Sequence, residues 1–505
     1  MVKKLVCLVL CGIMLIGALA SCGDNGTAQT AAKVPGGTPS SDDITTTLSA
    51  EELRDIRERI DTLKEAAPNG FDGAAFNVVG VEDAAFFPTE EEIIGDKESD
   101  AIYKRNMAVN DDFNVKITAV KCEDPHVVTD NVKNDVTAGT NQYHLVNGGV
   151  VSNGQDLFNN QYINPVDVYP DINLDGRWWQ NSLEEYYAIG NRVFFLAGDL
   201  SPSYFNTPFC VLFSKQLMED YDINVNLYDL VKNKEWTVDK MFDLAQAIPG
   251  GGDVYRYGNH ATSAGVALYF GAGNVMTTFD GEHMPVFVES FSNEAYDLAT
   301  KISAQTGDPS YSFNLAFDDI RSAYEKADEE CHRLFANDKI LFMVDTGGGI
   351  SDLRKLDTNG FGILPIPMGS ADQKDYISYS VSGFSAVFLP RNNQDTKMMG
   401  VVVEAMGAYG YQYIRPAFYD QRLKSKSSYD MESKEMLDII YSTEIYDLYD
   451  LYGGGSYDTG NGEAHKLIDE AMWVNSEGVM GKYSALVQMT KNQVKQFKKT
   501  AAKYN

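Results

Sequence analysis

Short apolar runs that alternate with helical stretches constrain the fold of this chain more than any other feature of its sequence. Residues 76–81, 113–120 and 143–149 have the pattern of strands, and residues 131–138 are typical of a helix. Strands and helices that alternate along a chain indicate an α/β fold, because helices then cover the faces of the sheet. No internal repeat at a fixed period is apparent, which argues against a solenoid.

The composition excludes some classes of protein. The chain has 505 residues and a formal net charge of −30, so its surface repels phosphates and we expect no nucleic-acid partner. With 44% hydrophobic and 23% charged residues, the bulk of the chain is neither disordered nor membrane-spanning. At about 100 to 200 residues for each domain, the chain is long enough for two or more domains.

The N-terminus has the features of a processing segment. Two lysines precede an apolar run over residues 5–20, which is too short and too abruptly ended for a membrane span. The stretch 18–22 resembles the lipobox of bacterial lipoproteins, in which cleavage precedes a cysteine whose sulfur carries a diacylglycerol. The resemblance implies a signal peptide over residues 1–21 and a lipid anchor on Cys22, on the extracytoplasmic face of the cell membrane. The alternative is an ordinary secretory signal with an incidental cysteine.

Two further segments precede the body of the chain. Residues 22–48 contain almost no large apolar side chain and therefore predict a disordered tether. Ser49 and Glu52 have the spacing of a capping box at the start of a helix, and apolar residues follow at helical spacing. We expect a spacer helix over residues 49–70 that links the tether to the body.

Further strand-like runs follow along the chain. They cover residues 192–199, 208–213, 340–344, 361–367 and 379–388. Several end in acidic or glycine-rich loops, which is where open α/β sheets bind ligands.

The end of the chain has a different pattern. Residues 484–503 place large apolar residues roughly on one face with lysines between them. This pattern predicts an amphipathic closing helix.

An ordered set of segments resembles the extracellular solute-binding proteins of family 1, the sugar receptors of bacterial ABC importers that include maltose-binding protein. The matching segments are residues 209–217, 226–231, 235–241, 361–367 and 434–440. They span most of the chain from about residue 71 onward, in the order of the family. One departure is Ser214 before Lys215, where the family commonly has Asn before Lys.

The resemblance implies an α/β, two-lobed fold of the type II periplasmic-binding-protein kind, with discontinuous lobes joined by a hinge. Lobe one would hold residues 71–206 and 382–427, and lobe two residues 207–381 and 428–505. A ligand that touches both lobes shifts such a protein toward its closed form, which then docks on the permease subunits. The resemblance also implies a carbohydrate ligand, with an oligosaccharide favoured, and we expect a monomer.

Candidate ligand-binding residues follow from the chemistry of sugars. Sugars have apolar ring faces and hydroxyl edges, so their sites combine aromatic side chains with acids, amides or backbone groups. We expect such residues at strand ends near the hinge, although each of them could equally be a solvated turn or a helix cap. The candidates are Glu82, Asp83, Asn147, Gly148, Asp199, Tyr204, Asn206, Asp345, Thr346 and Gly347.

Other conspicuous residues have simpler interpretations. Trp178 and Trp179 are adjacent, so at most one would usually face a given cleft, and we expect packing in the core or at its rim. Trp236 precedes Thr237, a plausible helix N-cap, and we expect the indole to pack against that helix. Cys210 lies in an apolar run and is expected to be a small buried residue.

Signals for metals, cofactors and enzymes are poor. Residues 171–176 begin like a calcium loop, but Ser182 stands where such a loop needs a bidentate Glu, so a turn is the expected structure. The six histidines are scattered and no catalytic motif is present, so we expect no cofactor, no metal and no enzyme activity. Two alternatives stay open: a surface-anchored glycoside hydrolase, whose carboxylate separation is invisible in a sequence, and a receptor that feeds a sensor kinase.

Replacement of the lipobox cysteine tests the predicted anchor. Cys22→Ala removes the sulfur that would carry the lipid, so the protein should leave the membrane fraction and appear in the soluble fraction. Fractionation of cells that produce either protein measures this distribution. Sedimentation of the variant with membranes, to the same extent as the unchanged protein, would show that the signal was misread.

Overall fold

The computed structural model describes most of the chain. The described residues are 48–81, 97–180, 182–259, 263–313, 322–353, 356, 360–380, 385–423, 431–454 and 462–504. The predicted signal peptide, Cys22, almost all of the predicted tether, and Glu82 and Asp83 lie outside these residues. None of the helices in the described ranges is long and apolar enough to cross a membrane.

A four-stranded sheet is built from the strands predicted near the start of the body. Its order is β12 (Ser385–Phe388), β3 (Leu145–Gly149), β1 (Ala74–Val81) and β2 (Val115–Cys122). β1 pairs in parallel with β2 and β3, and β12 pairs antiparallel with β3. The strand predictions for 76–81, 113–120 and 143–149 are confirmed, as is the helix over 131–138, which is part of α3 (Pro125–Ala138).

A five-stranded sheet holds the apolar runs from the middle of the chain. Its order is β10 (Phe361–Pro365), β4 (Phe209–Ser214), β9 (Ile340–Thr346), β5 (Tyr255–Asn259) and β8 (Ser312–Phe313). Every residue of β4 and β9 is buried, which explains why these two runs are apolar without alternation. Cys210 is 1% exposed in β4, as the sequence predicted.

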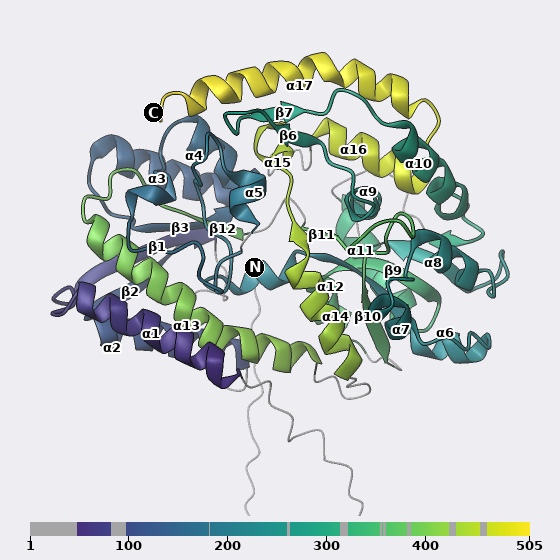
Figure 1. The fold of residues 1–505 in the computed structure, drawn as a ribbon, viewed down its shortest axis with the longest axis horizontal. Helices are drawn as coiled ribbons and strands as arrows, with labels where there is room; N and C mark the ends of the chain where they lie inside the picture. Colours follow the sequence, from purple (N-terminus) through teal and green to yellow (C-terminus); the bar gives the residue numbers. More distant parts are fainter. Residues whose placement is uncertain are drawn as a thin grey trace, which may run out of the picture. The chain divides into compact units, whose positions relative to one another are not determined.

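Helices and short pairings surround the two sheets (Figure 1). The α-helices in the first part of the chain are α1 (Ala50–Ala66), α2 (Lys97–Phe113), α4 (Gln155–Asn159), α5 (Leu183–Tyr187), α6 (Lys215–Asp220), α7 (Leu227–Lys232), α8 (Val238–Ala245) and α9 (Ala264–Gly271). Those that follow are α10 (Asn293–Thr306), α11 (Ser322–Ala336), α12 (Gly347–Leu353), α13 (Thr396–Leu423), α14 (Met431–Ser442), α15 (Tyr449–Tyr452), α16 (Glu463–Asp469) and α17 (Val479–Ala501). Shorter turns of helix are η1 (Val150–Gly154), η2 (Val166–Val168), η3 (Pro202–Asn206) and η5 (Glu470–Val474). Two small sheets pair β6 (Thr277–Phe279) with β7 (Pro285–Phe287), and β11 (Ser378–Tyr379) with β13 (Glu444–Ile445).

The chain passes from one large sheet to the other at adjacent points. It leaves η3 to enter β4, and it returns through β11 toward β12. An antiparallel bridge between Pro208 and Ser380 joins the two passages. We call residues 207–208 the first crossover and residue 380 the second crossover. The lobe limits expected from the sequence, after residues 206 and 381, lie beside these crossovers and remain a proposal.

The first helix of the described chain packs into the body. Ser49 and Glu52 form both hydrogen bonds of the predicted capping box. Ile56, Ile60 and Leu63 are buried and share a core with residues of α13, against which α1 packs. The sequence predicted a spacer ahead of the body, whereas in the structure this helix is part of the body. Its apolar side packs against α13, which is remote in the sequence: Arg59 of α1 contacts Glu404 of α13, 345 residues along the chain.

The closing helix predicted over 484–503 is confirmed as part of α17. Its residue Tyr483 stacks on Phe287 at 5.5 Å between ring centroids. Near its other end Phe497 stacks on Phe158 of α4 at 4.6 Å, and Tyr504 stacks on the same ring at 5.2 Å. The helix therefore contacts segments that come from well-separated parts of the sequence.

Trp178, Trp179 and Trp236 are buried in the structure. Trp178 and Trp179 are 4% and 3% exposed. Trp236 is fully buried and donates its indole N–H to the carbonyl of Pro365 at 2.9 Å. Thr237 caps α8 by accepting a hydrogen bond from the backbone N–H of Lys240.

Two other sequence predictions have different outcomes. The turn at residues 171–176 is confirmed, with Asp171 paired to Lys397 at 2.8 Å. The strand expected over 192–199 does not form, and the segment makes only isolated bridges, such as Leu196 with Val387. At Gly198, with φ of +145°, a Cβ would lie 2.2 Å from the carbonyl oxygen of Trp178, so close backbone contact replaces a regular ladder there.

Two leucines of α1 provide a test of its place in the core. Leu63 is 1% exposed and Leu53 is 38% exposed. Leu63→Ala should lower the free energy of unfolding by about 2–5 kcal/mol, since it leaves a cavity. Leu53→Ala should change it by less than about 0.5 kcal/mol. Urea titrations of the purified proteins measure both values, and equal losses would contradict the packing of α1 described above.

Candidate functional site

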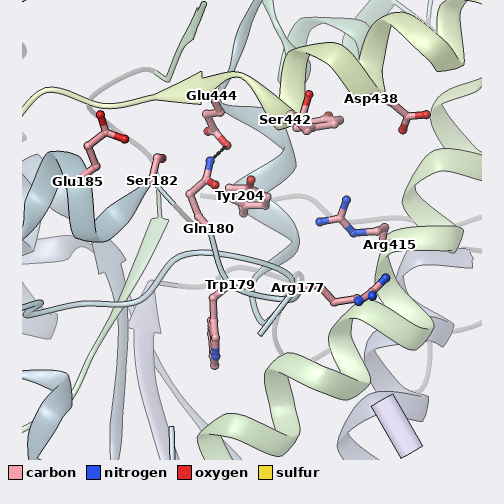
Figure 2. Close-up of a pocket in the computed structure, with 11 residues that line it drawn as sticks. Arg177, Trp179, Gln180, Ser182, Glu185, Tyr204, Arg415, Asp438, Ser442 and Glu444 are labelled. Atoms are coloured by element: carbon pink, nitrogen blue, oxygen red, sulfur yellow. Dashed lines mark hydrogen bonds between the residues drawn. The ribbon is translucent and has the colours of Figure 1, made fainter. Parts of the chain in front are cut away.

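A pocket of about 400 Å³ lies beside the two crossovers (Figure 2). Its lining is mostly polar, with three aromatic residues among acids, hydroxyls, an amide and two arginines. The lining residues are Arg177, Trp179, Gln180, Ser182, Glu185, Tyr204, Arg415, Asp438, Tyr441, Ser442 and Glu444.

The lining comes from segments that are far apart in the sequence. One part is supplied by residues 177–182, α5, η3 and α13. The other part is supplied by the last turns of α14 and by β13. In terms of the lobes expected from the sequence, the first group belongs to lobe one and the second to lobe two. The lining is therefore shared between segments that are assigned to different expected lobes.

Glu444 forms the floor of the pocket and is 3% exposed. Its carboxyl accepts hydrogen bonds from the side-chain amide of Gln180 at 2.7 Å and from the hydroxyl of Tyr446 at 2.9 Å. The hydroxyl of Tyr204 also bonds to it. Burial raises the pKa of Glu444 to about 7, against the opposing effect of these hydrogen bonds.

Arg415 is held rigidly at the wall of the pocket. Its guanidinium makes two hydrogen bonds of 2.8 Å to the carboxyl of Asp199. The same group lies over the rings of Tyr411, at 4.7 Å, and Phe205, at 5.3 Å. Burial raises the pKa of Asp199, and the Arg415 charge offsets part of that rise. This bidentate pair fixes the direction of the arginine.

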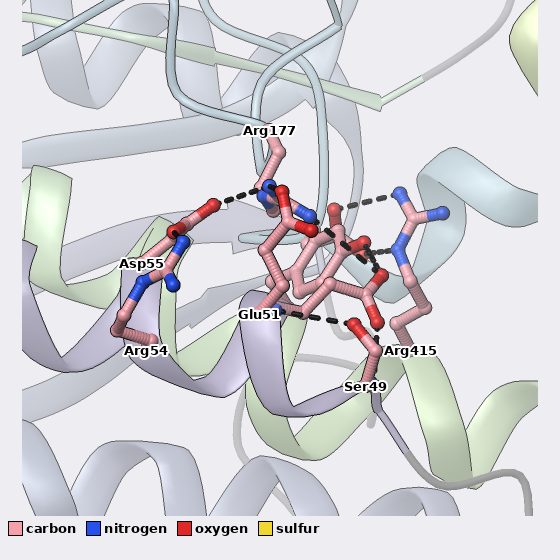
Figure 3. A network of polar contacts seen from close by, with 9 residues as sticks. Ser49, Glu51, Arg54, Asp55, Arg177 and Arg415 are labelled. Atoms are coloured by element: carbon pink, nitrogen blue, oxygen red, sulfur yellow. Dashed lines mark hydrogen bonds and ion pairs between the residues drawn. The ribbon is translucent and has the colours of Figure 1, made fainter.

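Arg177 is held by the first turns of α1 (Figure 3). It pairs with Asp55 and lies 3.9 Å from the carboxyl of Glu52. Glu52 in turn accepts a hydrogen bond of 2.5 Å from the hydroxyl of Tyr411. Burial tends to raise the pKa of Glu52, but the hydrogen bonds from Tyr411 and Ser49 and the Arg177 charge hold it below its usual value. The start of α1 therefore supports one side of the pocket.

The pocket residues can recognise a polar, hydroxylated molecule. Carboxyl, amide, hydroxyl and guanidinium groups together offer both donors and acceptors. The indole N–H of Trp179 is bonded to Glu404 at 2.9 Å, so the polar edge of that ring is already satisfied within the protein. Within the described part of the chain, no group of three or more His, Cys, Asp and Glu side chains could hold a metal ion.

The structure brings some of the predicted site residues to this pocket. Tyr204 lines it, and Asp199 acts behind it by fixing Arg415. Asn206 is exposed at the end of η3, which contacts α12. Of these three, only Tyr204 lines the pocket itself.

The candidates at the end of β9 lie outside the pocket lining. Asp345 is fully buried, and its carboxyl is 2.8 Å from the ring Nε2 of His332. Thr346 is 8% exposed and pairs with Phe209, and Gly347 begins α12. Asp345 therefore faces the interior of the protein.

Asn147 and Gly148 lie in β3, also outside the pocket lining. They pair with Val387 and Ala386 of β12. The side-chain oxygen of Asn147 is buried without a hydrogen-bond partner among the described residues. The side chain of Asn153 packs closely on Gly148: a Cβ at position 148 would lie 2.5 Å from the Asn153 side-chain oxygen.

Sequence reasoning missed most of the lining residues. Gln180 follows the tryptophan pair, and Glu444 follows the end of α14, with no motif at either place. Of the lining residues, Tyr204 alone was proposed from the sequence, because it lies near the expected hinge. Arg177 and Arg415 carried no signal because sugar sites were sought among acids, amides and aromatic residues.

The Asp199–Arg415 pair generates a stability prediction. Asp199→Ala leaves a guanidinium whose side chain is 21% exposed without its bidentate partner, which should cost about 3 kcal/mol. Asp438→Ala removes an exposed acid from the same pocket and should change stability by less than about 0.5 kcal/mol. Chemical denaturation measures both. A small loss for Asp199→Ala would show that the pair does not hold the wall of the pocket.

Comparison of the sequence with known families and proteins yields no match. No family model matches the chain. No curated protein matches it either.

Solved structures, in contrast, are similar in fold. The galacto-N-biose-/lacto-N-biose I-binding protein of the ABC transporter from Bifidobacterium longum, in complex with lacto-N-biose, has a TM-score of 0.52 at 13% identity, covering 85% of this chain and 99% of that chain. UgpB from Mycobacterium tuberculosis, in complex with glycerophosphocholine, has a TM-score of 0.52 at 10% identity, covering 85% and 99%. UspC from M. tuberculosis has a TM-score of 0.52 at 10% identity, covering 82% and 100%. The chain therefore has the two-lobed α/β fold of the periplasmic-binding-protein type, as the sequence predicted.

Proposed function

We propose that the chain is the solute-binding protein of an ABC importer, which captures a carbohydrate between its two lobes and delivers it to the permease. The observation that carries this proposal is the pocket beside the crossovers, whose lining is shared between Gln180, Tyr204 and Arg415 on one side and Asp438 and Glu444 on the other. A ligand held by both groups favours the arrangement in which they are close together. The permease would then recognise that arrangement.

The chemistry of the lining supports a hydroxylated solute. A volume of about 400 Å³ lies within the usual range of small-molecule pockets and suits a short oligosaccharide. Similar folds in complex with lacto-N-biose and with glycerophosphocholine hold ligands that both carry hydroxyl groups. The fold alone does not select between such ligands, so the lining residues support a carbohydrate as a class.

The location follows from the N-terminal segment. A lipid on Cys22 would anchor the protein on the extracytoplasmic face of the membrane, where an importer needs its receptor. Residues 22–48, as a tether, would give the body reach toward the permease. We propose that the protein acts there as a monomer.

A panel of solutes tests the proposal directly. Thermal melting of the purified protein is followed with oligosaccharides, monosaccharides, polyols, glycerophosphodiesters and peptides. A ligand that binds only the folded state at about a hundredfold its Kd adds about 2.7 kcal/mol of stability. A shift with a sugar that chromatography recovers intact supports capture, whereas cleaved sugar favours the hydrolase. Absence of any shift across the panel would contradict the proposal.

Uptake separates transport from signalling. Deletion of the gene should abolish uptake of the sugar that the purified protein binds. Unchanged uptake of that sugar would favour the alternative of a receptor that feeds a sensor kinase.

Variants of the pocket should weaken binding of the solute found in the panel. Gln180→Ala and Asp438→Ala each remove a polar group from opposite parts of the lining and should raise Kd about tenfold. Glu219→Ala, at an exposed position in α6 outside the pocket, is the matched control and should leave Kd unchanged. Isothermal titration measures the three values. Equal affinities in all variants would move the binding site away from this pocket.

A further inference from the structure

A line of short contacts connects the pocket floor to both crossovers. The carboxyl oxygen Oε1 of Glu444 lies 2.6 Å from the hydroxyl oxygen of Ser380, at the second crossover. That hydroxyl lies 2.8 Å from the hydroxyl of Thr207, at the first crossover. The Thr207 hydroxyl in turn lies 2.9 Å from the backbone carbonyl oxygen of Tyr204.

Counting protons along this line indicates the state of the carboxyl. The three contacts need three protons, one for each hydrogen bond. Ser380 and Thr207 supply one proton each, and the carbonyl of Tyr204 supplies none. The Ser380 hydroxyl is placed to donate both to Glu444 and to Thr207, but it has only one proton. All three hydrogen bonds therefore form together only when Glu444 carries the third proton and donates to Ser380, while Ser380 donates to Thr207 and Thr207 donates to the carbonyl.

The other neighbours of Glu444 are compatible with a protonated carboxyl. Gln180 and Tyr446 donate to oxygens that keep free lone pairs when one oxygen carries a proton. No salt bridge joins Glu444 to a cation in the described part of the chain. Burial raises the pKa of this carboxyl to about 7, the same direction that the proton count requires.

Other titratable groups face this region from the surrounding elements. Tyr204 on η3 and Tyr446 after β13 bond to the carboxyl, and burial raises the pKa of both phenols well above their usual value. Arg177, Arg415 on α13, Asp438 on α14 and Glu185 on α5 line the same pocket. The two arginines would favour an ionised Glu444 and the two acids would oppose it, so these charges do not decide the protonation state of Glu444.

We propose that Glu444 is a positioning residue that retains its proton near neutral pH, and that this proton holds the two crossovers and the pocket-lining side chains of Gln180 and Tyr204 in one hydrogen-bonded unit. Ionisation of Glu444 removes one of the three protons, so one contact in the line loses its hydrogen bond. The link between the pocket floor and the crossovers then weakens.

The pH dependence of stability tests the proton without knowledge of any solute. Because the pKa of Glu444 rises from 4.5 to about 7 on folding, its contribution to stability is fully present below about pH 4.5 and is lost as pH rises through about 7. Glu444→Gln cannot ionise and mimics the neutral carboxyl. Relative to this variant, the unfolding equilibrium constant of the unchanged protein should rise about a hundredfold between about pH 4.5 and pH 8.

A matched control isolates the effect. Glu185→Gln changes an exposed glutamate of the same pocket and should follow the pH profile of the unchanged protein. Other buried carboxyls, such as Asp450 and Asp469, are present in every variant, so their contributions cancel in the difference. Parallel profiles for the unchanged protein and Glu444→Gln would overturn the proposal.

A second measurement applies if Glu444→Gln does not fold. Carbon-13 NMR of the protein labelled at glutamate carboxyls should show one carboxyl that titrates near neutral pH. Ser380→Ala should change the chemical shift of that resonance, because it removes the hydroxyl that accepts the hydrogen bond from Glu444. A spectrum in which every glutamate ionises in the usual acidic range would also overturn the proposal.

The positioning role of Glu444 rests on the proposed function, and it is tested by measuring the Kd of a bound solute. With a solute from the panel, Glu444→Gln should keep its Kd within about threefold and make it independent of pH between about 6 and 8. Glu444→Ala should raise Kd about tenfold or more, since Gln180 and Tyr204 lose their partner. If no solute binds the unchanged protein, the proposed function fails. The pH profile of stability still shows whether Glu444 retains its proton. If both variants bind alike, the positioning role fails.

Discussion

The arrangement of this protein depends on the pairing of two chain crossovers. Pro208 and Ser380 form an antiparallel bridge where the chain enters β4 and where it returns from β11 toward β12. The hydroxyls of Thr207 and Ser380 add a second link at 2.8 Å. Because the pocket-lining residues Tyr204 and Glu444 are attached directly to this junction, the shape of the pocket follows from it. The junction therefore lies directly behind two of the residues that line the pocket.

Buried acids connect the remaining parts of the structure. Glu404 of α13 is fully buried and bonds to Arg59 of α1 at 2.8 Å and to Trp179 at 2.9 Å. Asp199 holds Arg415 in the same way. Each acid is compensated by donors from a different segment, which is how a chain of net charge −30 can place carboxyls in its interior. The start of α1, the tryptophan segment and the pocket wall are therefore supported together.

The regular elements could be predicted from the sequence to a greater extent than the site. β1, β2 and β3 and the capping box at Ser49 depend on neighbouring residues, so their patterns are visible locally. The pocket is different, because Gln180 and Glu444 meet although they are 264 positions apart. Tyr204 was proposed because it lies near the expected hinge, and it does line the pocket. Asp345 was proposed because it ends a strand-like run, but its side chain bonds to His332 in the interior.

The sequence by itself determined where α1 begins, which runs form the strands β1, β2 and β3 and that the fold is α/β, since hydrogen bonds and apolar periodicity within a segment decide these features. Only the tertiary structure decided which acids are buried, which of them are paired and where a pocket forms. The physical reason is desolvation: the free energy of a carboxyl depends on the water and the donors around it, and those are supplied by remote segments. Glu444 and Glu185 are the same residue type in one pocket, yet the former is buried among donors and the latter is exposed.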